Sequence, residues 1–197
     1  MTDPARSPQF PRVGPARHAT GAPAAPAAMP DFRDLFSKEF DYVWFTLRRL
    51  GVPPRDLEDV AHDVFMHVHK HLQEYDARRP IRAWLFGFAY RVASDYRRLA
   101  RHRLEQLDAQ PELEDRAPSV ADQVERKQML DIATAALDEL ELGRRAVFIL
   151  HDVEGLSAPE IAETLSIPLN TAYSRLRLAR KQFNKSLARW RLRRGEP

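Results

Sequence analysis

Apolar side chains return at every third or fourth position along most of this chain, which is the periodicity of an α-helix. The pattern holds over 32–50, 60–72, 81–102 and 120–190. No stretch shows the strict apolar–polar alternation of a half-buried strand. The sequence therefore predicts an all-α protein.

Two stretches without this periodicity divide the chain. Residues 1–30 are rich in proline and alanine, and we expect them to form a disordered tail. Residues 104–119 combine acidic side chains with two prolines, which is typical of a linker. The expected architecture is two small helical domains joined by this acidic linker and followed by a short basic tail: 31–103, 120–190 and 191–197.

The composition limits the classes of function. The 197 residues contain no cysteine, which excludes disulfides, thiolate catalysis and cysteine-ligated zinc. No apolar run is long enough to span a membrane, and the N-terminus lacks the apolar core of a signal peptide. We therefore expect a soluble cytoplasmic protein. The formal net charge of +3 is compatible with a nucleic-acid partner.

A helix-turn-helix pattern occupies the stretch GLSAPEIAETLSIPLNTAYSRLRLARKQF, residues 155–183. Ser157 and Glu160 have the spacing of a capping box, which predicts the start of the first helix. Pro168 prevents that helix from continuing, because its ring removes a backbone donor. We expect Asn170 to cap the second helix.

The second helix of this pattern has two distinct faces at about 100° per residue. One face is apolar, and the other carries short polar and basic groups suited to base edges and phosphates in a major groove. This outer face comprises Asn170, Ser174, Arg177, Leu178 and Lys181. The pattern alone leaves an ordinary helical hairpin with a solvated basic face as the alternative.

A second unusual stretch, RRPIRAWLFGFAYRVASDYRRLARHR at 78–103, interleaves aromatic and basic residues. Its aromatic residues are too many for one buried stripe, so some must face outward or line a pocket. Flat rings beside cations are what single-stranded nucleic acid requires, since the rings stack on bases and the cations hold the backbone. The alternative is a core helix whose long basic side chains reach into solvent.

Together these two stretches resemble the two-domain, extracytoplasmic-function (ECF) type of the bacterial sigma-70 family, over about residues 32–187. DLEDVAHDVFMHVHKHL resembles the family's segment that docks on the β′ clamp helices of RNA polymerase. RAWLFGFAYRVASDYRRLARHR resembles its minus-ten helix. LDELELGRRAVFILHDVEGLSAPEIAETLSIPLNTAYSRLRLAR resembles its minus-thirty-five domain. The three segments occur in the family's order and spacing.

The resemblance implies a factor that binds core RNA polymerase at the β′ clamp helices and the β flap. It implies melting of a single-stranded minus-ten element by Trp84, Phe88, Arg91, Asp95 and Arg98. It implies duplex minus-thirty-five contacts from Asn170, Thr171, Tyr173, Ser174, Arg175, Arg177, Leu178 and Lys181. The polymerase contacts it implies are Asp56, Glu58, Asp59, Asp63 and Phe65.

The same resemblance implies no catalytic residue and no cofactor in this chain, since the chemistry belongs to the polymerase. It also implies an inhibitory anti-sigma partner and a place at the bacterial nucleoid. Several positions depart from the family pattern. Tyr173 and Leu178 stand where basic residues are frequent, Gly87 stands where an arginine is, and Arg91 stands where an asparagine is common. The usual promoter preference is therefore not carried over.

Two other classes of function remain as alternatives. His62, His67, His69 and His71 lie within ten residues, which raises the possibility of a metal-dependent hydrolase. The aligned stripe of Asp63, His67 and His71 spans about 12 Å along a helix, too long for one metal ion, so we expect surface or interface histidines. A stand-alone helix-turn-helix repressor or activator is the second alternative, although it has no use for a single-strand stacking surface.

Overall fold

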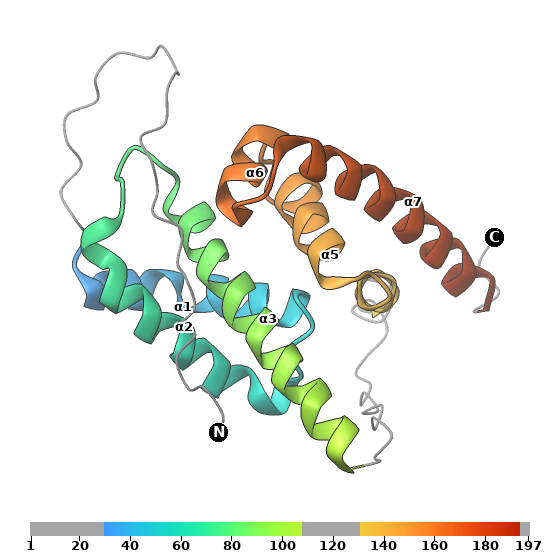
Figure 1. The fold of residues 1–197 in the computed structure, drawn as a ribbon, viewed down its shortest axis with the longest axis horizontal. Coiled ribbons are helices and arrows are strands. Elements are labelled where there is room, and N and C mark those ends of the chain that lie inside the picture. The colour runs from blue at the N-terminus through green and yellow to red at the C-terminus, as the bar shows by residue number, and fades with distance from the viewer. Residues whose placement is uncertain (1–29, 108–130, 194–197) are drawn as a thin grey trace, which may run out of the picture.

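The computed structural model describes residues 30–107 and 131–193, and within these two ranges every regular element is helical. The predicted all-α class is confirmed. Residues 1–29, 108–130 and 194–197 lie outside the described ranges, so the expected N-terminal tail, nearly all of the linker and most of the basic tail lie there as well. Figure 1 shows the first range in blue to green and the second in yellow to red.

The first domain consists of α1 (Phe32–Arg49), α2 (Leu57–His71) and α3 (Ile81–Leu107), with two short 3₁₀ turns at Pro54–Asp56 and Leu72–Glu74. The Asp31 side chain caps α1 by accepting hydrogen bonds from the backbone of Arg33 (2.9 Å) and Asp34 (3.3 Å). The chain leaves α1 through Gly51, whose φ of 89° lies in the left-handed region that glycine adopts without strain. Each of the three helices packs on the other two.

Helix α3 continues to Leu107, beyond the expected end near His102 and past the domain boundary at residue 103. The four residues after that boundary, Leu104-Glu105-Gln106-Leu107, are all good helix formers, and the first proline comes only at 111. Acidic composition alone does not end a helix. Helix α3 therefore continues into the first residues of the expected linker, 104–107.

The second domain contains a helix at 131–138, followed by α5 (Leu142–Phe148), a π-helical turn (Ile149–Val153), α6 (Ala158–Leu165) and α7 (Leu169–Arg193). The predicted capping box is present, because the Glu160 carboxylate accepts hydrogen bonds from the backbone N–H (2.8 Å) and the hydroxyl (2.6 Å) of Ser157. Those bonds lower the pKa of Glu160. Helix α6 ends in Ser166, which takes a left-handed φ of 54°.

Asn170 does not cap the second helix as expected. Helix α7 already begins at Leu169, and the Pro168 carbonyl accepts the backbone N–H of Thr171 (2.9 Å) and of Ala172 (3.1 Å). Proline is well suited to this place because its fixed φ precedes the helix without strain. Asn170 thus lies inside the first turn, with its side chain exposed.

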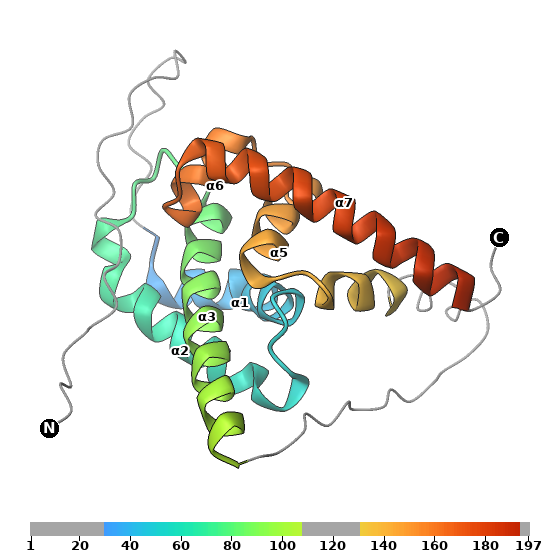
Figure 2. The same cartoon turned by 45° about the vertical axis from the view of Figure 1, so that its right-hand side comes forward.

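The two domains pack directly on each other through α3 and α6 (Figures 1 and 2). Buried residues of both domains form one continuous apolar core, which extends from Val43 and Leu85 in the first to Val147 and Ile161 in the second. The sequence predicted two tethered domains but contained no sign of this contact. Within the described ranges no helix is both long and apolar enough to cross a bilayer.

We predict that Ser157→Ala destabilises the second domain by about 1 kcal/mol, because the substitution removes the side-chain acceptor of the Glu160 backbone N–H in the capping box. Urea denaturation followed by circular dichroism measures the change. Ser37→Ala is the matched control, since Ser37 lies within α1 and its hydroxyl bonds only to the Arg33 carbonyl of the preceding turn. Equal denaturation midpoints for wild type and Ser157→Ala would contradict the assigned cap.

Candidate nucleic-acid interface

The outer face of α7 presents the polar and basic side chains that the helix-turn-helix pattern predicted. Asn170, Ser174, Arg177 and Lys181 are exposed, and Leu178 is half-buried beside them. On the opposite face Ala172, Leu176 and Ala179 are buried against the rest of the domain. Helices α5 and α6 therefore pack against one side of α7 and leave the other side open.

Tyr173 and Leu169 add apolar surface at the start of this outer face. Tyr173 is 54% exposed and Leu169, one turn earlier, is 42% exposed. The Ser174 hydroxyl donates to the Thr171 carbonyl at 3.0 Å, and Thr171 itself is half-buried. The first two turns of α7 therefore combine an aromatic ring with a polar edge.

Arg175 departs from the expected set of DNA contacts. It is half-buried, and its guanidinium lies against the start of α5, where a Cβ atom on Gly143 would come within 3.0 Å of it. The reason is helical geometry, because Arg175 is placed beside the buried stripe rather than opposite to it. Of the predicted basic contacts on α7, Arg177 and Lys181 remain on the outer face.

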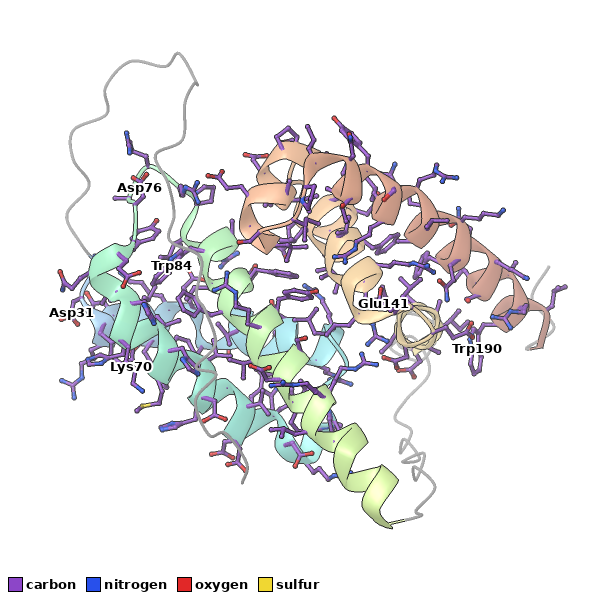
Figure 3. All side chains as sticks on the ribbon, in the orientation of Figure 1. Asp31, Lys70, Asp76, Trp84, Glu141 and Trp190 are labelled. Carbon is purple, nitrogen blue, oxygen red and sulfur yellow. The ribbon has the colours of Figure 1, made fainter. Side chains whose placement is uncertain are left out.

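Ion pairs fix the rest of α7 to its own domain. Arg180 donates to the Asp152 carboxylate in the π-helical turn, with Nε at 3.1 Å from Oδ2 and a terminal nitrogen at 2.5 Å from Oδ1. Near the other end of α7, Glu139 accepts hydrogen bonds from Ser186, Arg189 and Trp190. Figure 3 labels Trp190 there. Since these arginines have carboxylate partners, they stiffen the helix and are not part of its outer face.

In the first domain, Trp84 lies between two other rings. Its centroid is 5.0 Å from that of Tyr75 and 4.9 Å from that of Phe88, which it meets edge to face. Phe88 is only 4% exposed and Phe86 is fully buried, whereas Trp84 is half-buried. Phe88 therefore departs from the expected base contact, because its ring is a packing surface under Trp84.

The other two surplus aromatics of α3 are also half-buried. The Tyr96 hydroxyl donates to Asp56 at 2.5 Å, and Tyr90 packs at the edge of the core. Phe86 and Phe88 therefore lie in the core, whereas the other aromatic residues of α3 form a partly exposed layer. Trp84 and Tyr90 belong to that layer.

Several arginines lie on α3 and in the loop before it, and Arg91 is the one in contact with the ring cluster. Arg91 is half-buried, which lowers its pKa, and its guanidinium is 5.9 Å from the Phe88 ring. Arg98 is exposed and pairs with Asp95 at 3.0 Å, one turn earlier. Before α3, the loop 75–80 adds Arg78, paired with Asp76, and Arg79. These loop residues were absent from the predicted site, although the twin arginines at 78–79 were visible in the sequence.

The residues predicted to contact the polymerase lie along α2 and in the 3₁₀ turn before it. Glu58, Asp59 and Asp63 are exposed on one side of the helix, and Asp56 is half-buried beneath Tyr96. Phe65 departs from the expectation, because it is 2% exposed and packs among Phe32, Phe36 and Phe40. The exposed apolar residue on this helix is Met66 instead.

The histidines of α2 have ordinary neighbours. His69 meets the Phe32 ring edge to face at 4.6 Å, and His71 is 3.0 Å from the Glu74 carboxylate. Burial, followed by the nearby Lys70 charge, lowers the pKa of His67. Within the residues that the structure covers, no group of three or more potential ligands is placed to hold a metal ion.

Comparison with known families identifies both domains. The family model for sigma-70 region 2 matches residues 35–103, and that for sigma-70 region 4 matches residues 130–183. The chain belongs to the sigma-70 family. The first domain is its region 2, and α5 to α7 belong to its region 4.

Curated relatives place the chain among the ECF type. It is 34% identical over 168 residues to the ECF RNA polymerase sigma factor SigE of Mycolicibacterium smegmatis, covering 83% of this chain and 64% of that protein. It is 31% identical over 171 residues to the ECF sigma factor SigL of Mycobacterium tuberculosis, covering 85% of this chain and 94% of SigL. The chain thus spans nearly all of SigL and about two thirds of the longer SigE.

Solved structures show the same fold. CnrH in complex with the cytosolic domain of CnrY aligns with a TM-score of 0.54 at 26% identity, over 80% of this chain and 87% of CnrH. The sigma factor RpoE in complex with the anti-sigma factor NepR from Bartonella quintana aligns with a TM-score of 0.61 at 19% identity, over 80% and 97% of the two chains. The second likeness concerns the fold alone.

We predict that Lys181→Ala weakens binding to duplex promoter DNA and reduces the slope of log K against log salt concentration by about 0.9, the value for one lost phosphate contact. Fluorescence anisotropy at several salt concentrations measures the slope. Lys38→Ala removes the same charge from an exposed position on α1 and should leave the slope unchanged. A slope that Lys181→Ala does not alter would place this lysine away from the backbone.

Proposed function

We propose that this chain is an alternative sigma factor that binds core RNA polymerase, directs it to specific promoters and starts transcription there. The observation that supports this most strongly is the pairing of two DNA-facing surfaces of different chemistry. Region 2 has rings and arginines suited to unstacked bases, and region 4 has an open polar helix face suited to a major groove. A stand-alone duplex reader has no use for the first of these surfaces.

In this proposal, α2 docks on the β′ clamp helices through its exposed acidic residues Glu58, Asp59 and Asp63, and region 4 also contacts the β flap. Trp84 and the arginines around it hold the melted minus-ten strand. The outer face of α7 enters the minus-thirty-five major groove. The chain itself performs no chemistry and needs no cofactor, and it works in the cytoplasm at the nucleoid.

Binding energy opens the duplex in this scheme. Unstacking costs a few kcal/mol per base step, and a splayed base recovers it by stacking and by contacts to its edge. Tyr173 and Leu169 add exposed apolar groups at the start of the recognition helix, where such groups favour contact with thymine methyl groups. The promoter preference of this chain therefore has to be determined by experiment, because the preference of its relatives does not transfer.

An anti-sigma partner is part of the same proposal. CnrH and the Bartonella RpoE are each seen in a complex, the first with the cytosolic domain of CnrY and the second with the anti-sigma factor NepR. The aromatic cluster of α1 and α2 gives such a partner an apolar surface here, since Phe36 is exposed on it, and Met66 of α2 is exposed as well. The chain has no cysteine, so redox sensing would reside in the partner.

We predict that purified chain plus core polymerase yields promoter-specific transcripts from genomic fragments. Runoff transcription with start-site mapping gives both promoter elements in one experiment. Core polymerase alone is the control. The proposal fails if the chain produces no start sites beyond those of core polymerase on any fragment.

We further predict that Trp84→Ala weakens holoenzyme binding to a minus-ten single strand by about 5- to 150-fold, which corresponds to the loss of about 1–3 kcal/mol of stacking. Trp84→Phe keeps a flat ring and should retain most of the affinity. Thermal melting of both variants separates loss of binding from loss of fold. Unchanged affinity in a folded Trp84→Ala protein would remove Trp84 from the strand-binding surface.

A further inference from the structure

Helix α7 continues past the part of the chain that matches the sigma-70 family. The match with region 4 ends at residue 183, whereas α7 runs from Leu169 to Arg193. At about 1.5 Å per residue, this helix is a rod about 37 Å long. Figure 2 shows α7 continuing well past α5, above the yellow helix at 131–138. Residues 184–193 are thus an addition to the matched domain, the α7 extension.

Glu139, in the turn before α5, holds the α7 extension against its own domain. Its carboxylate accepts hydrogen bonds from Ser186 and Arg189 and, at 3.1 Å, from the indole of Trp190. Ser186 is fully buried at this contact. One turn earlier, the Gln182 side chain donates to the Glu139 backbone carbonyl at 2.7 Å. Donors from successive turns of α7 thus converge on one residue, which fixes the direction of the extension.

The opposite side of the α7 extension is exposed. Lys185 continues, at steps of four residues, the stripe that Arg177 and Lys181 begin, and all three side chains are exposed. Ala188 and Leu192 follow on the same face, and Leu192 is 76% exposed. The outer face of the recognition helix therefore continues through the extension.

This outer face carries cations and no anion. Helix α7 contains no aspartate or glutamate between Leu169 and Arg193. Two of its arginines, Arg180 and Arg189, have carboxylate partners within region 4. Among the described residues, by contrast, no carboxylate forms an ion pair with Lys181 or Lys185. A polyanion is the kind of partner that such a face fits.

The length of α7 indicates which part of a polyanion the extension can reach. A recognition helix reads base edges with its N-terminal residues, in a major groove about 12 Å wide. Because the groove winds around the DNA axis, a straight rod about 37 Å long cannot stay within it. Duplex DNA carries one phosphate charge about every 1.7 Å of its axis. Lys185 therefore meets the phosphate backbone where the C-terminal half of α7 leaves the groove.

We propose that the α7 extension is a second DNA contact, in which Lys185 binds a backbone phosphate at the edge of the minus-thirty-five element and Glu139 positions the extension for it. This inference rests on the proposed sigma-factor function and adds a contact beyond the matched region 4 domain. The contact carries no sequence information, because every base pair presents the same phosphates. It increases affinity and fixes the orientation of the recognition helix, whose first turns read the bases.

The test measures binding of holoenzyme, made from the full chain and core polymerase, to a promoter duplex mapped by runoff transcription. Lys185→Ala should reduce the slope of log K against log salt concentration by about 0.9, which means about 3.5-fold less loss of affinity between about 50 and 200 mM salt. Lys38→Ala removes an equal charge from an exposed position on α1 and should leave the slope unchanged. An unchanged slope in Lys185→Ala would overturn the phosphate contact.

Uncharged phosphate analogues locate the contact. A series of duplexes carries one methylphosphonate linkage at successive positions through the minus-thirty-five element and on both sides of it. At one position near an edge of the element, this linkage should weaken wild-type binding but should not weaken Lys185→Ala any further, because the same charge pair is already lost. Losses that add at every position would show that Lys185 faces an acidic protein surface or solvent instead of DNA.

Sequence preference provides a second check on the kind of contact. Lys185→Ala should leave the ranking of promoter variants unchanged, because a phosphate contact does not distinguish bases. Asn170→Ala, at the start of the recognition helix, should change the ranking, because an asparagine side chain reads base edges. A changed ranking in Lys185→Ala would assign Lys185 to the bases and contradict the proposal.

The positioning role of Glu139 is tested by a pair of variants. Glu139→Ala removes the acceptor of all three side-chain donors, so it should lower the salt slope as Lys185→Ala does. Glu139→Gln keeps one side-chain oxygen and should retain more of the slope. Thermal melting of both variants separates loss of this contact from loss of fold. A folded Glu139→Ala protein with the wild-type slope would refute the positioning role.

Failure of this inference is distinguishable from failure of the sigma-factor assignment. Start-site mapping with wild-type holoenzyme tests the assignment without reference to Lys185. If wild type starts promoter-specific transcription and Lys185→Ala keeps the wild-type slope, only the second contact is wrong. If wild type starts no such transcription, the assignment fails and this inference fails with it.

Discussion

The structure depends on the burial of α3 from two sides. Leu85, Phe86, Ala89 and Ala93 are fully buried and span about 100° of the helix circumference, which accounts for the contacts with α1 and α2. Gly87 lies opposite to that stripe at about 100° per residue. There the helix has no side chain, and α6 approaches its backbone. Both regions therefore pack against α3, and the apolar core continues from one region to the other along this helix.

The local features of the fold were predictable because each depends on residues close together in sequence. The capping box needs only Ser157 and Glu160, the turn between α6 and α7 needs only Pro168 and its neighbours, and the amphipathic spacing of α7 defines its open face. The error at Asn170 has the same local origin. A proline carbonyl and an asparagine side chain both satisfy first-turn donors, and the sequence does not say which of the two the helix uses.

The parts that the sequence could not predict are those in which distant residues meet. Helical spacing could not show that Arg180 would pair with Asp152, or that Arg175 would lie against Gly143, because both depend on how α5 and α7 pack. The same holds for Phe65 and Phe88, which are buried by neighbours from other helices. A basic residue on a predicted recognition helix is therefore a weak indication of DNA contact until its carboxylate partners are known.

The placement of carboxylates decides which arginines remain open to nucleic acid. Arg180 and Arg189 are paired within region 4, so that pairing stiffens the domain. Arg49 and Arg79 are paired across the boundary with Glu154 and Glu163, so these ion pairs connect region 2 to region 4. Both kinds of ion pair weaken as the salt concentration rises, because dissolved ions screen exposed charges. Since exposed ion pairs contribute only about 0–1 kcal/mol each, the contact between the two regions depends mainly on the apolar core that they share.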